Sequence, residues 1–159
     1  MRVRQAELRD IPILTGLFIE LLDQLKGYGQ WMLSDDPAAT ENGVVAFLLG
    51  KMHTEENVVF VATDDDDRPT GFLVGWVMNY PIFYQHTRVA ELQFLHPLSF
   101  KEAPYLLKAF EKWGRDIGAT AETNYASPNN EPSIRCMVRD GRRLSYLHFC
   151  KPYEVSHDI

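Results

Sequence analysis

The sequence predicts a single α/β (α+β) domain with a mixed central sheet of about six to seven strands and about four flanking helices. Three observations predict this fold class. The 159 residues have the length of one domain, and 45% of them are apolar, which is an ordinary globular value. Short β-branched segments alternate with amphipathic helical segments along the chain. The sequence contains no internal repeat and no linker-like stretch, so one domain over residues 1–159 is expected.

Each element is predicted from local patterning. The expected strands cover residues 2–5, 58–63, 71–78, 88–96, 120–126 and 143–150, and the expected helices cover residues 10–27, 43–52, the segment from Pro97 to 117, and 132–140. Asp10 stands where a helix N-cap is expected, and Pro12 follows in the first turn, where its missing N–H is harmless. The strand at 71–78 is apolar on both faces, which predicts a central position with helices on each side.

The charge balance argues against two classes of partner. Sixteen basic and twenty-two acidic side chains give a net charge of -6, which disfavours a general surface for nucleic acid or for anionic membranes. No apolar run approaches the length of a membrane span or of a signal peptide, so we expect a cytoplasmic protein. Cys136 and Cys150 stand among apolar neighbours and are expected to be reduced.

Two predicted loops carry aromatic side chains that could frame a ligand. Residues 28–42 contain Trp31, and residues 79–87 contain Tyr84. Either loop could cover a substrate, or its aromatic side chains could pack beneath the loop itself, and the sequence leaves both open. The four aspartates at 64–67 lack the spacing of a calcium loop, so we expect a solvated hairpin tip and no metal site.

Residues 91–118 join a strand to an amphipathic helix through a break at Pro97. The free N–H groups and the dipole of a helix N-terminus favour an anion at such a junction. Ser99 and Glu102 also match the S-x-x-E capping box, in which the protein satisfies those groups itself. A helix that begins near Ala103 is the alternative.

The order of elements, together with two segments, resembles the GCN5-related N-acetyltransferase (GNAT) superfamily over nearly the whole chain. The segment AELQFLHPLSFKEAPYLLKAFEKWGRDIGA is similar to the fourth strand and third helix of that family, and NEPSIRCMVRDG has the register of its N-x-x-A…Y-x-x-x-G segment. In its overall pattern the chain resembles small divergent GNAT-like proteins of bacteriophages, including those associated with virion assembly.

This resemblance implies that acetyl-CoA lies between the fourth and fifth strands. The implied cofactor contacts are Phe94, Leu95, Lys101, Ala103, Tyr105 and Asn130. Glu91 takes the place of the base that removes the amine proton, and Trp31 and Tyr84 would frame the acceptor. From the residues alone, Glu91 could equally be a strand-end carboxylate that is solvated or paired with Arg88.

The phosphate-binding segment departs from the family pattern. The family holds the pyrophosphate with backbone N–H groups of a glycine-containing loop, whereas residues 98–105 contain no glycine. Pro104 removes one N–H group, and Glu102 places a carboxylate where a phosphate would bind.

The proton donor of the family is also missing from its usual place. Met137 stands four residues before Gly141, where the family often has the tyrosine that protonates the leaving thiolate. Tyr125 or Tyr146 could replace it only if the fold brings one of them near, and both are expected to be core aromatics.

Two hypotheses follow from the resemblance and its departures. The first is an acetyl-CoA-dependent N-acetyltransferase with a degenerate pyrophosphate loop, acting on a small-molecule or peptide amine. The second is a catalytically silent GNAT-shaped module that binds a protein partner, for example a phage protein in the host cytoplasm or the virion. A homodimer is one arrangement that either could adopt.

Overall fold

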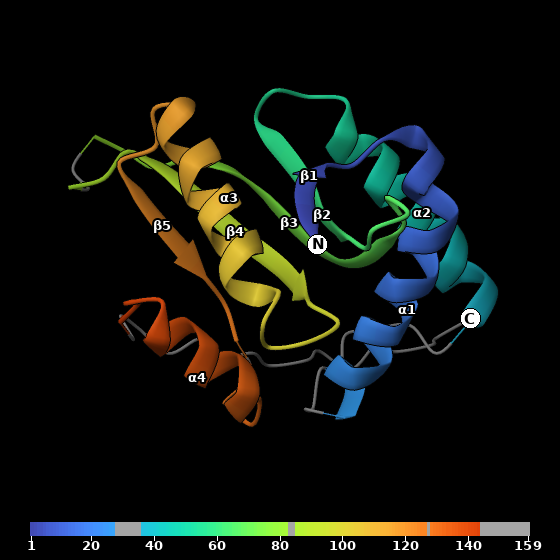
Figure 1. The fold of residues 1–159 in the computed structure, drawn as a ribbon. Helices are drawn as coiled ribbons and strands as arrows, with labels where there is room; N and C mark the ends of the chain where they lie inside the picture. Colours follow the sequence, from blue (N-terminus) through green and yellow to red (C-terminus); the bar gives the residue numbers. More distant parts are fainter. Residues whose placement is uncertain (28–35, 83–84, 127, 144–159) are drawn as a thin grey trace, which may run out of the picture.

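The computed structural model describes residues 1–27, 36–82, 85–126 and 128–143. The strands of this part of the chain are β1 (Arg2–Gln5), β2 (Asn57–Thr63), β3 (Pro69–Asn79), β4 (Arg88–His96) and β5 (Ala121–Asn124). Its helices are α1 (Ile11–Gly27), α2 (Pro37–Met52), α3 (Ala103–Asp116) and α4 (Glu131–Arg139), with a short 3₁₀ turn, η1 (Leu8–Asp10), before α1. Figure 1 shows their arrangement.

The strands form one mixed sheet in the order β1-β2-β3-β4-β5. The first three pairings are antiparallel, and β5 lies parallel to β4. The predicted α+β fold is therefore confirmed, and β3 is the central strand, as its two apolar faces predicted. The described residues contain five strands, and the predicted strand at 143–150 lies outside them except for Arg143.

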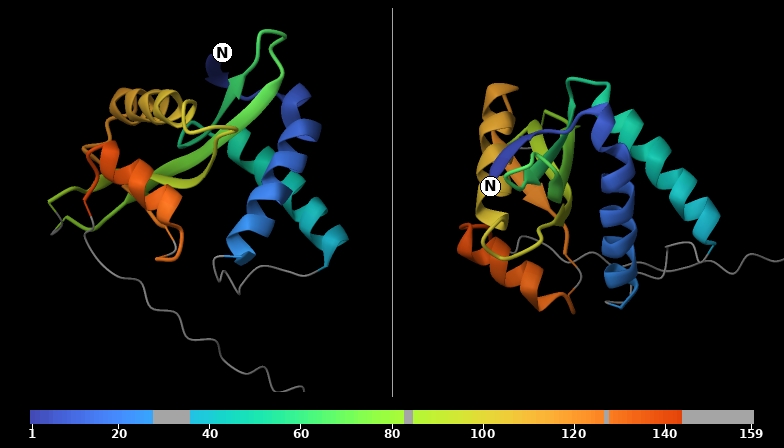
Figure 2. Two further views of the ribbon diagram at one scale, coloured as in Figure 1. Left: turned by 60° about the horizontal axis from the view of Figure 1, so that its bottom comes forward. Right: turned by 45° about the vertical axis from the view of Figure 1, so that its right-hand side comes forward.

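Helices cover both faces of the sheet. Figure 2 shows α1 and α2 on one side and α3 on the other. Each side has its own apolar core, because alternate residues of β2 and β3 point to opposite faces. Phe72 and Val74 pack with α1 and α2, whereas Leu73 packs with α3.

Helix α2 begins six residues earlier than the sequence predicted. The Asp36 carboxylate accepts hydrogen bonds from the backbone N–H groups of Ala38 and Ala39, and Pro37 occupies the first turn. This is a strong N-cap signal, and Gly43, at which we placed the start, lies inside the helix. Residues 37–42, predicted as loop, are therefore helical.

The glycines of β3 permit two close approaches. A Cβ atom on Gly75 would lie 2.3 Å from the Phe110 ring of α3 and 2.9 Å from the Glu91 carbonyl oxygen. A Cβ atom on Gly71 would lie 2.8 Å from the His96 carbonyl oxygen and 2.9 Å from the Glu102 carboxylate. Glycine at both positions lets β4 and the start of α3 lie close against β3.

The turn at 64–67 joins β2 and β3 as a hairpin, as expected. Asp67, which has a φ of 61°, is not simply solvated, because its carboxylate binds Arg4 and Arg9. The described residues contain no group of His, Cys, Asp or Glu side chains that could hold a metal ion. Within the same ranges, no helix is long and apolar enough to cross a bilayer.

Candidate functional site

A β-bulge in β4 sets the geometry of the candidate site. Val74 of β3 pairs with Phe94, but the next residue, Gly75, pairs with Leu92, so Gln93 is an extra residue on β4. A bulge shifts the alternation of side chains by one residue. Glu91 and Phe94, three residues apart, therefore point to the same face of the sheet.

That shared face is the one covered by α1 and α2. Phe94 packs against Phe18 of α1, with 4.8 Å between the ring centroids. Glu91 is paired with Trp76, which follows Phe72 and Val74 on the same face of β3. The bulge therefore brings a carboxylate and an aromatic wall to one side of a single strand.

Glu91 is a buried carboxyl group in a hydrogen-bonded setting. Its exposed fraction is 4%, so the interpretation as a solvated strand-end carboxylate is wrong. Burial raises the pKa of Glu91, and hydrogen bonds from the side chains of Gln93, Trp76 and Tyr125 partly oppose that shift. Arg88 does not neutralise it, since its guanidinium binds Glu56, Asn79 and the Ile117 carbonyl oxygen. A raised pKa suits a general base near neutral pH.

Tyr125 is the site residue for which the sequence predicted another role. It is 43% exposed and hydrogen-bonds to Glu91, so the prediction of a core aromatic is wrong. The reason lies in strand pairing, because Thr123 of β5 is directly opposite Glu91 and Tyr125 follows immediately after the end of β5. The sequence alone does not give the register that places it there.

Lys51 of α2 adds a positive charge to this face. Its Nζ lies 3.8 Å from the centroid of the Trp76 ring and 3.3 Å from Asn57 Oδ1. Burial lowers the pKa of Lys51, while the aromatic face favours its charged form. A cation therefore lies beside the indole that contacts the Glu91 carboxylate.

Strand β4 is paired with β5 over only part of its length. The parallel ladder joins Val89–Leu92 to Ala121–Asn124 and ends there. β4 continues to His96, and no described strand pairs with Gln93–His96 on that side. We call these four residues the open β4 edge. Their backbone groups can hydrogen-bond an extended ligand that lies along the strand, and Figure 1 shows β5 ending before β4 does.

The junction between β4 and α3 does not form the predicted capping box. α3 begins at Ala103, and the side chain of Glu102 does not cap it. Instead, the buried Glu102 carboxylate accepts the Leu98 N–H at 2.8 Å and the Thr70 hydroxyl at 3.1 Å. Of the two alternatives that the sequence left open, the helix start at Ala103 is confirmed, and the capping box does not form because the carboxylate has partners in its own loop and on β3.

Several backbone N–H groups at this junction already have partners within the protein. The N–H groups of Glu102, Tyr105 and Leu106 hydrogen-bond backbone carbonyl oxygens, and Pro104 has none. The three side chains Leu98, Phe100 and Tyr105 are exposed around it, at 69%, 68% and 58%. This loop therefore combines the absence of glycine with a buried carboxyl group and an apolar rim.

The remaining predicted contact residues lie in different environments. Leu95 packs with the α3 side of the core, Ala103 is buried at the first position of α3, and Lys101 is exposed. The Asn130 side chain caps α4 by accepting the Ser133 N–H at 3.2 Å. Trp31 and Tyr84 lie outside the described residues.

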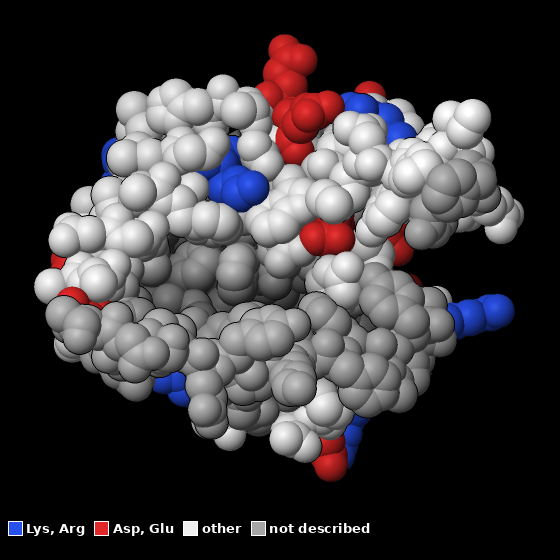
Figure 3. All heavy atoms as spheres, turned by 180° about the vertical axis from the view of Figure 1, so that it is seen from behind, with Lys and Arg blue, Asp and Glu red and all other residues white. Residues whose placement is uncertain are grey.

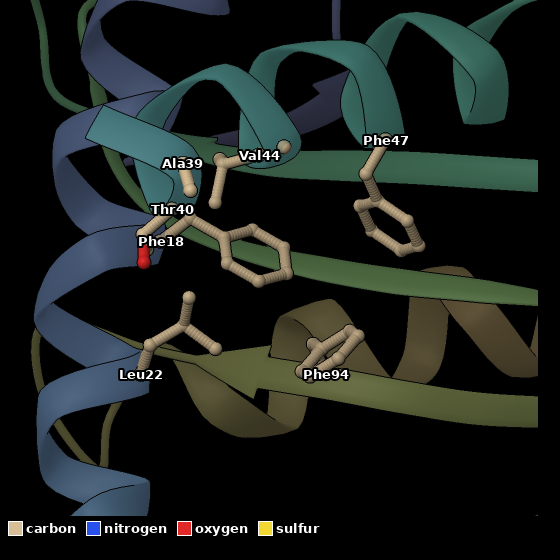
Figure 4. Close-up of a pocket in the computed structure, with 8 residues that line it drawn as sticks. Phe18, Leu22, Ala39, Thr40, Val44, Phe47 and Phe94 are labelled. Carbon is tan, nitrogen blue, oxygen red and sulfur yellow. The ribbon is translucent and has the colours of Figure 1, made fainter. Parts of the chain in front are cut away.

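A cavity of about 200 Å³ lies between α1, α2 and β4. Its lining residues are Phe18, Leu22, Ala39, Thr40, Gly43, Val44, Phe47 and Phe94, and we call it the phenylalanine cavity. Figure 4 shows Phe18, Phe47 and Phe94 pointing into it from three different elements. The Thr40 hydroxyl is the single polar side-chain group among these lining residues.

Figure 3 shows the face of the molecule seen from behind Figure 1. Uncharged surface covers most of its described part, acidic side chains gather at the upper edge, and Lys and Arg side chains lie beside acidic ones at the upper right and at the bottom. The described part of this face therefore shows no extended basic patch of the kind that recognises a polyanion.

Comparison with solved structures identifies the fold. A probable acetyltransferase matches with a TM-score of 0.74 and 23% identity, over 98% of this chain and 100% of the other. The aminoglycoside N-acetyltransferase AAC(6')-Iy in complex with CoA matches with a TM-score of 0.75 and 18% identity, over 95% and 93%. The chain has the GNAT-like fold of these acetyltransferases.

A third match is a predicted acetyltransferase from Clostridium acetobutylicum, whose structure contains acetyl-CoA, with a TM-score of 0.72 and 13% identity. It covers 94% of this chain and 95% of the other. No protein-family model and no curated protein matches the sequence. At these identities the likeness extends to the fold, and the activity has to be argued from the site.

Proposed function

We propose that this protein transfers an acetyl group from the thioester of acetyl-CoA to an amine, with Glu91 as the general base. One observation carries the proposal. The buried Glu91 carboxyl lies on the strand that borders both the open β4 edge and the phenylalanine cavity. Neighbours of the same fold hold CoA or acetyl-CoA, which supports a thioester as the donor.

The first step in this proposal is removal of a proton from the acceptor amine. The Glu91 carboxylate accepts it, and the neutral nitrogen attacks the acetyl carbonyl carbon. Attack forms the new C–N bond, and the C–S bond then breaks. Lys51 assists, because a fixed cation on the same face disfavours a second positive charge and so favours the neutral amine.

Tyr125 is proposed to return a proton to the departing thiolate. Its hydroxyl is hydrogen-bonded to Glu91, so the proton that Glu91 gained can replace the one that Tyr125 donates. This role fills the place left by Met137, whose thioether has no proton to give. An ammonium nitrogen loses two protons on becoming an amide: one replaces the proton that Tyr125 gives to the thiolate, and the other leaves to solvent.

The site suits the pantetheine arm of acetyl-CoA better than it suits the pyrophosphate. The open β4 edge offers backbone groups to a pantetheine arm, and Phe94 and Leu95 lie on that edge. The β4–α3 junction contains the buried Glu102 carboxyl, and the N–H groups of Leu98 and Glu102 already have partners, so we propose that it contributes less to the pyrophosphate. In our proposal the donor is held mainly by its pantetheine arm, and contacts from Lys101, Ala103, Tyr105 and Asn130 remain secondary.

The described residues give no support for an aminoglycoside acceptor. The compared enzyme acts on aminoglycosides, which are polycationic. The eight residues that line the phenylalanine cavity carry no acidic side chain. A different class of amine is therefore proposed below.

A binding module without catalysis is the second candidate. The exposed Leu98, Phe100 and Tyr105 at the β4–α3 junction favour it, because such apolar side chains suit a protein contact. A phage assembly protein is one form that this module could take, and a homodimer is another.

Thiol release from acetyl-CoA distinguishes the two candidates. We expect the purified protein to release CoA thiol in the presence of amines and to yield an acetylated amine detectable by mass spectrometry. If calorimetry detects no acetyl-CoA binding at millimolar concentration and no thiol is released, the enzyme proposal fails and the module remains.

A further inference from the structure

We infer that the acceptor is a primary amine whose apolar body, about the size of a phenyl ring, occupies the phenylalanine cavity while its amino group reaches Glu91. This inference rests on the proposed function and specifies its substrate class. Three features carry it: the lining of the cavity, its size, and its position relative to Glu91.

The lining selects for an apolar group. Phe18, Phe47 and Phe94 lie edge to face, with ring centroids 4.8 to 5.8 Å apart. Leu22, Val44 and Ala39 complete the apolar wall. A sugar hydroxyl or a second ammonium in this cavity would lose its water and find only the Thr40 hydroxyl among the lining side chains, which is costly.

The size selects for a single ring or a branched chain. An apolar cavity of about 150 Å³ lined by similar side chains accepts benzene in a protein core. The cavity here has about 200 Å³ and is open to the surface at Ala39 and Gly43, so it has room for a ring together with the first carbons of a linker.

The bulge places the cavity within reach of the base. Phe94 is three residues from Glu91 and on the same face, at about 3.3 Å of strand per residue, so their Cα atoms are separated by about 10 Å or less. Without the extra residue Gln93, Phe94 would point to the α3 side and the cavity would lose one wall. In the inferred complex a short linker follows β4 from the ring in the cavity and carries the amino group to Glu91.

Gly43 offers a variant that fills the cavity without disturbing the fold. It lies on α2 and lines the cavity, and a Cβ atom there would meet no atom within 4 Å. Gly43→Leu puts an apolar side chain into the space and also replaces a poor helix former. Gly50→Leu is the matched control, because Gly50 lies on the same helix, has equal room, and does not line the cavity.

The experiment compares phenethylamine, ethylamine and putrescine as acceptors by thiol release, and measures phenethylamine binding alone by calorimetry. We expect kcat/KM for phenethylamine to exceed that for either other amine by roughly tenfold or more. Gly43→Leu should lower this preference at least fivefold, mainly through KM, and weaken phenethylamine binding. Gly50→Leu should change neither.

Each other outcome has a definite meaning. Turnover without preference for phenethylamine, or a preference that Gly43→Leu leaves intact, overturns this inference and leaves the proposed function standing. Phenethylamine binding that Gly43→Leu removes, without turnover of any amine, supports the cavity as an amine site and overturns the proposed function. Absence of both binding and turnover overturns the two together.

Discussion

Two buried carboxyl groups, one in the first half of strand β4 and one just beyond its second half, have different surroundings. In the first half, Glu91 is buried with its pKa raised, and it contacts the side chains Gln93, Trp76 and Tyr125. Just beyond the second half, Glu102 is equally buried, but its oxygens accept a backbone N–H and a hydroxyl that fix the loop in place. The Glu91 carboxyl has a raised pKa and lies beside the partly exposed Tyr125, so it is available for proton transfer. The Glu102 carboxyl completes the hydrogen bonds of its own loop and stabilises the fold.

This comparison predicts the largest effect at Glu91. Glu91→Gln keeps the shape of the side chain but cannot take a proton, so kcat for acetyl transfer should fall by about 10²- to 10⁴-fold. Steady-state thiol release measures this. Glu111→Gln, at an exposed glutamate of α3, is the control and should keep full activity. A Glu91→Gln variant that retains more than half of the wild-type kcat would refute its role as base.

Tyr125 should give the next largest effect. Tyr125→Phe removes the hydroxyl that contacts Glu91, and we expect kcat to fall by roughly tenfold to a hundredfold with a small change in KM. A thiol leaving group that is already acidic should restore part of the rate, because it needs less help from a proton donor. If KM rises and kcat is unchanged, Tyr125 binds substrate and is not a proton donor.

The raised pKa of Glu91 also predicts an effect on stability. As pH rises, the unfolded state releases this proton first, so the folded state loses stability between the ordinary pKa of a glutamate and the raised pKa of Glu91. Glu91→Gln should therefore increase the free energy of unfolding at pH 7, and the gain should shrink as the pH falls below the ordinary value. Urea unfolding across this pH range measures it. A variant that is less stable at pH 7 would show that the hydrogen bonds of Glu91 outweigh its burial.

Glu102 should affect stability with little effect on rate. Glu102→Ala leaves the Leu98 N–H without its partner and should cost about 1–3 kcal/mol in the free energy of unfolding. Thr70→Val removes the hydroxyl that donates to Glu102 and to the Ala62 carbonyl oxygen but leaves the Leu98 N–H paired, so it should cost less, about 0.5–1.5 kcal/mol. Chemical denaturation gives both values. A large loss of kcat in either variant, with folding intact, would place the junction in the catalytic machinery.

The sequence predicted the elements that depend on local patterning. The central strand β3 was predicted from its two apolar faces, and α4 from Pro132 and Gly141. The start of α2 was predicted wrongly, because the Asp36-Pro37 cap was not given enough weight against Gly43.

The site depends on features that link distant residues. Glu91 was proposed as the base from the family resemblance, whereas its burial beside Trp76 and Tyr125 depends on how distant strands pack together. The bulge at Gln93 depends on the register between β3 and β4, and no local sequence pattern predicts it. The sequence left a capping box open for Glu102, because its partner Thr70 is 32 residues away and no local pattern indicates it.

The central claim is that β4 binds the pantetheine arm and the thioester of the donor, whereas the β4–α3 junction contributes little to binding of the pyrophosphate. Calorimetric titration with acetyl-CoA and with S-acetyl-pantetheine, which lacks the nucleotide and the pyrophosphate, tests it most directly. We predict that both bind, with dissociation constants within roughly tenfold of each other, since only the shared arm meets a built site. Acetyl-CoA binding a hundredfold more tightly than S-acetyl-pantetheine, or no binding of either, would contradict this account.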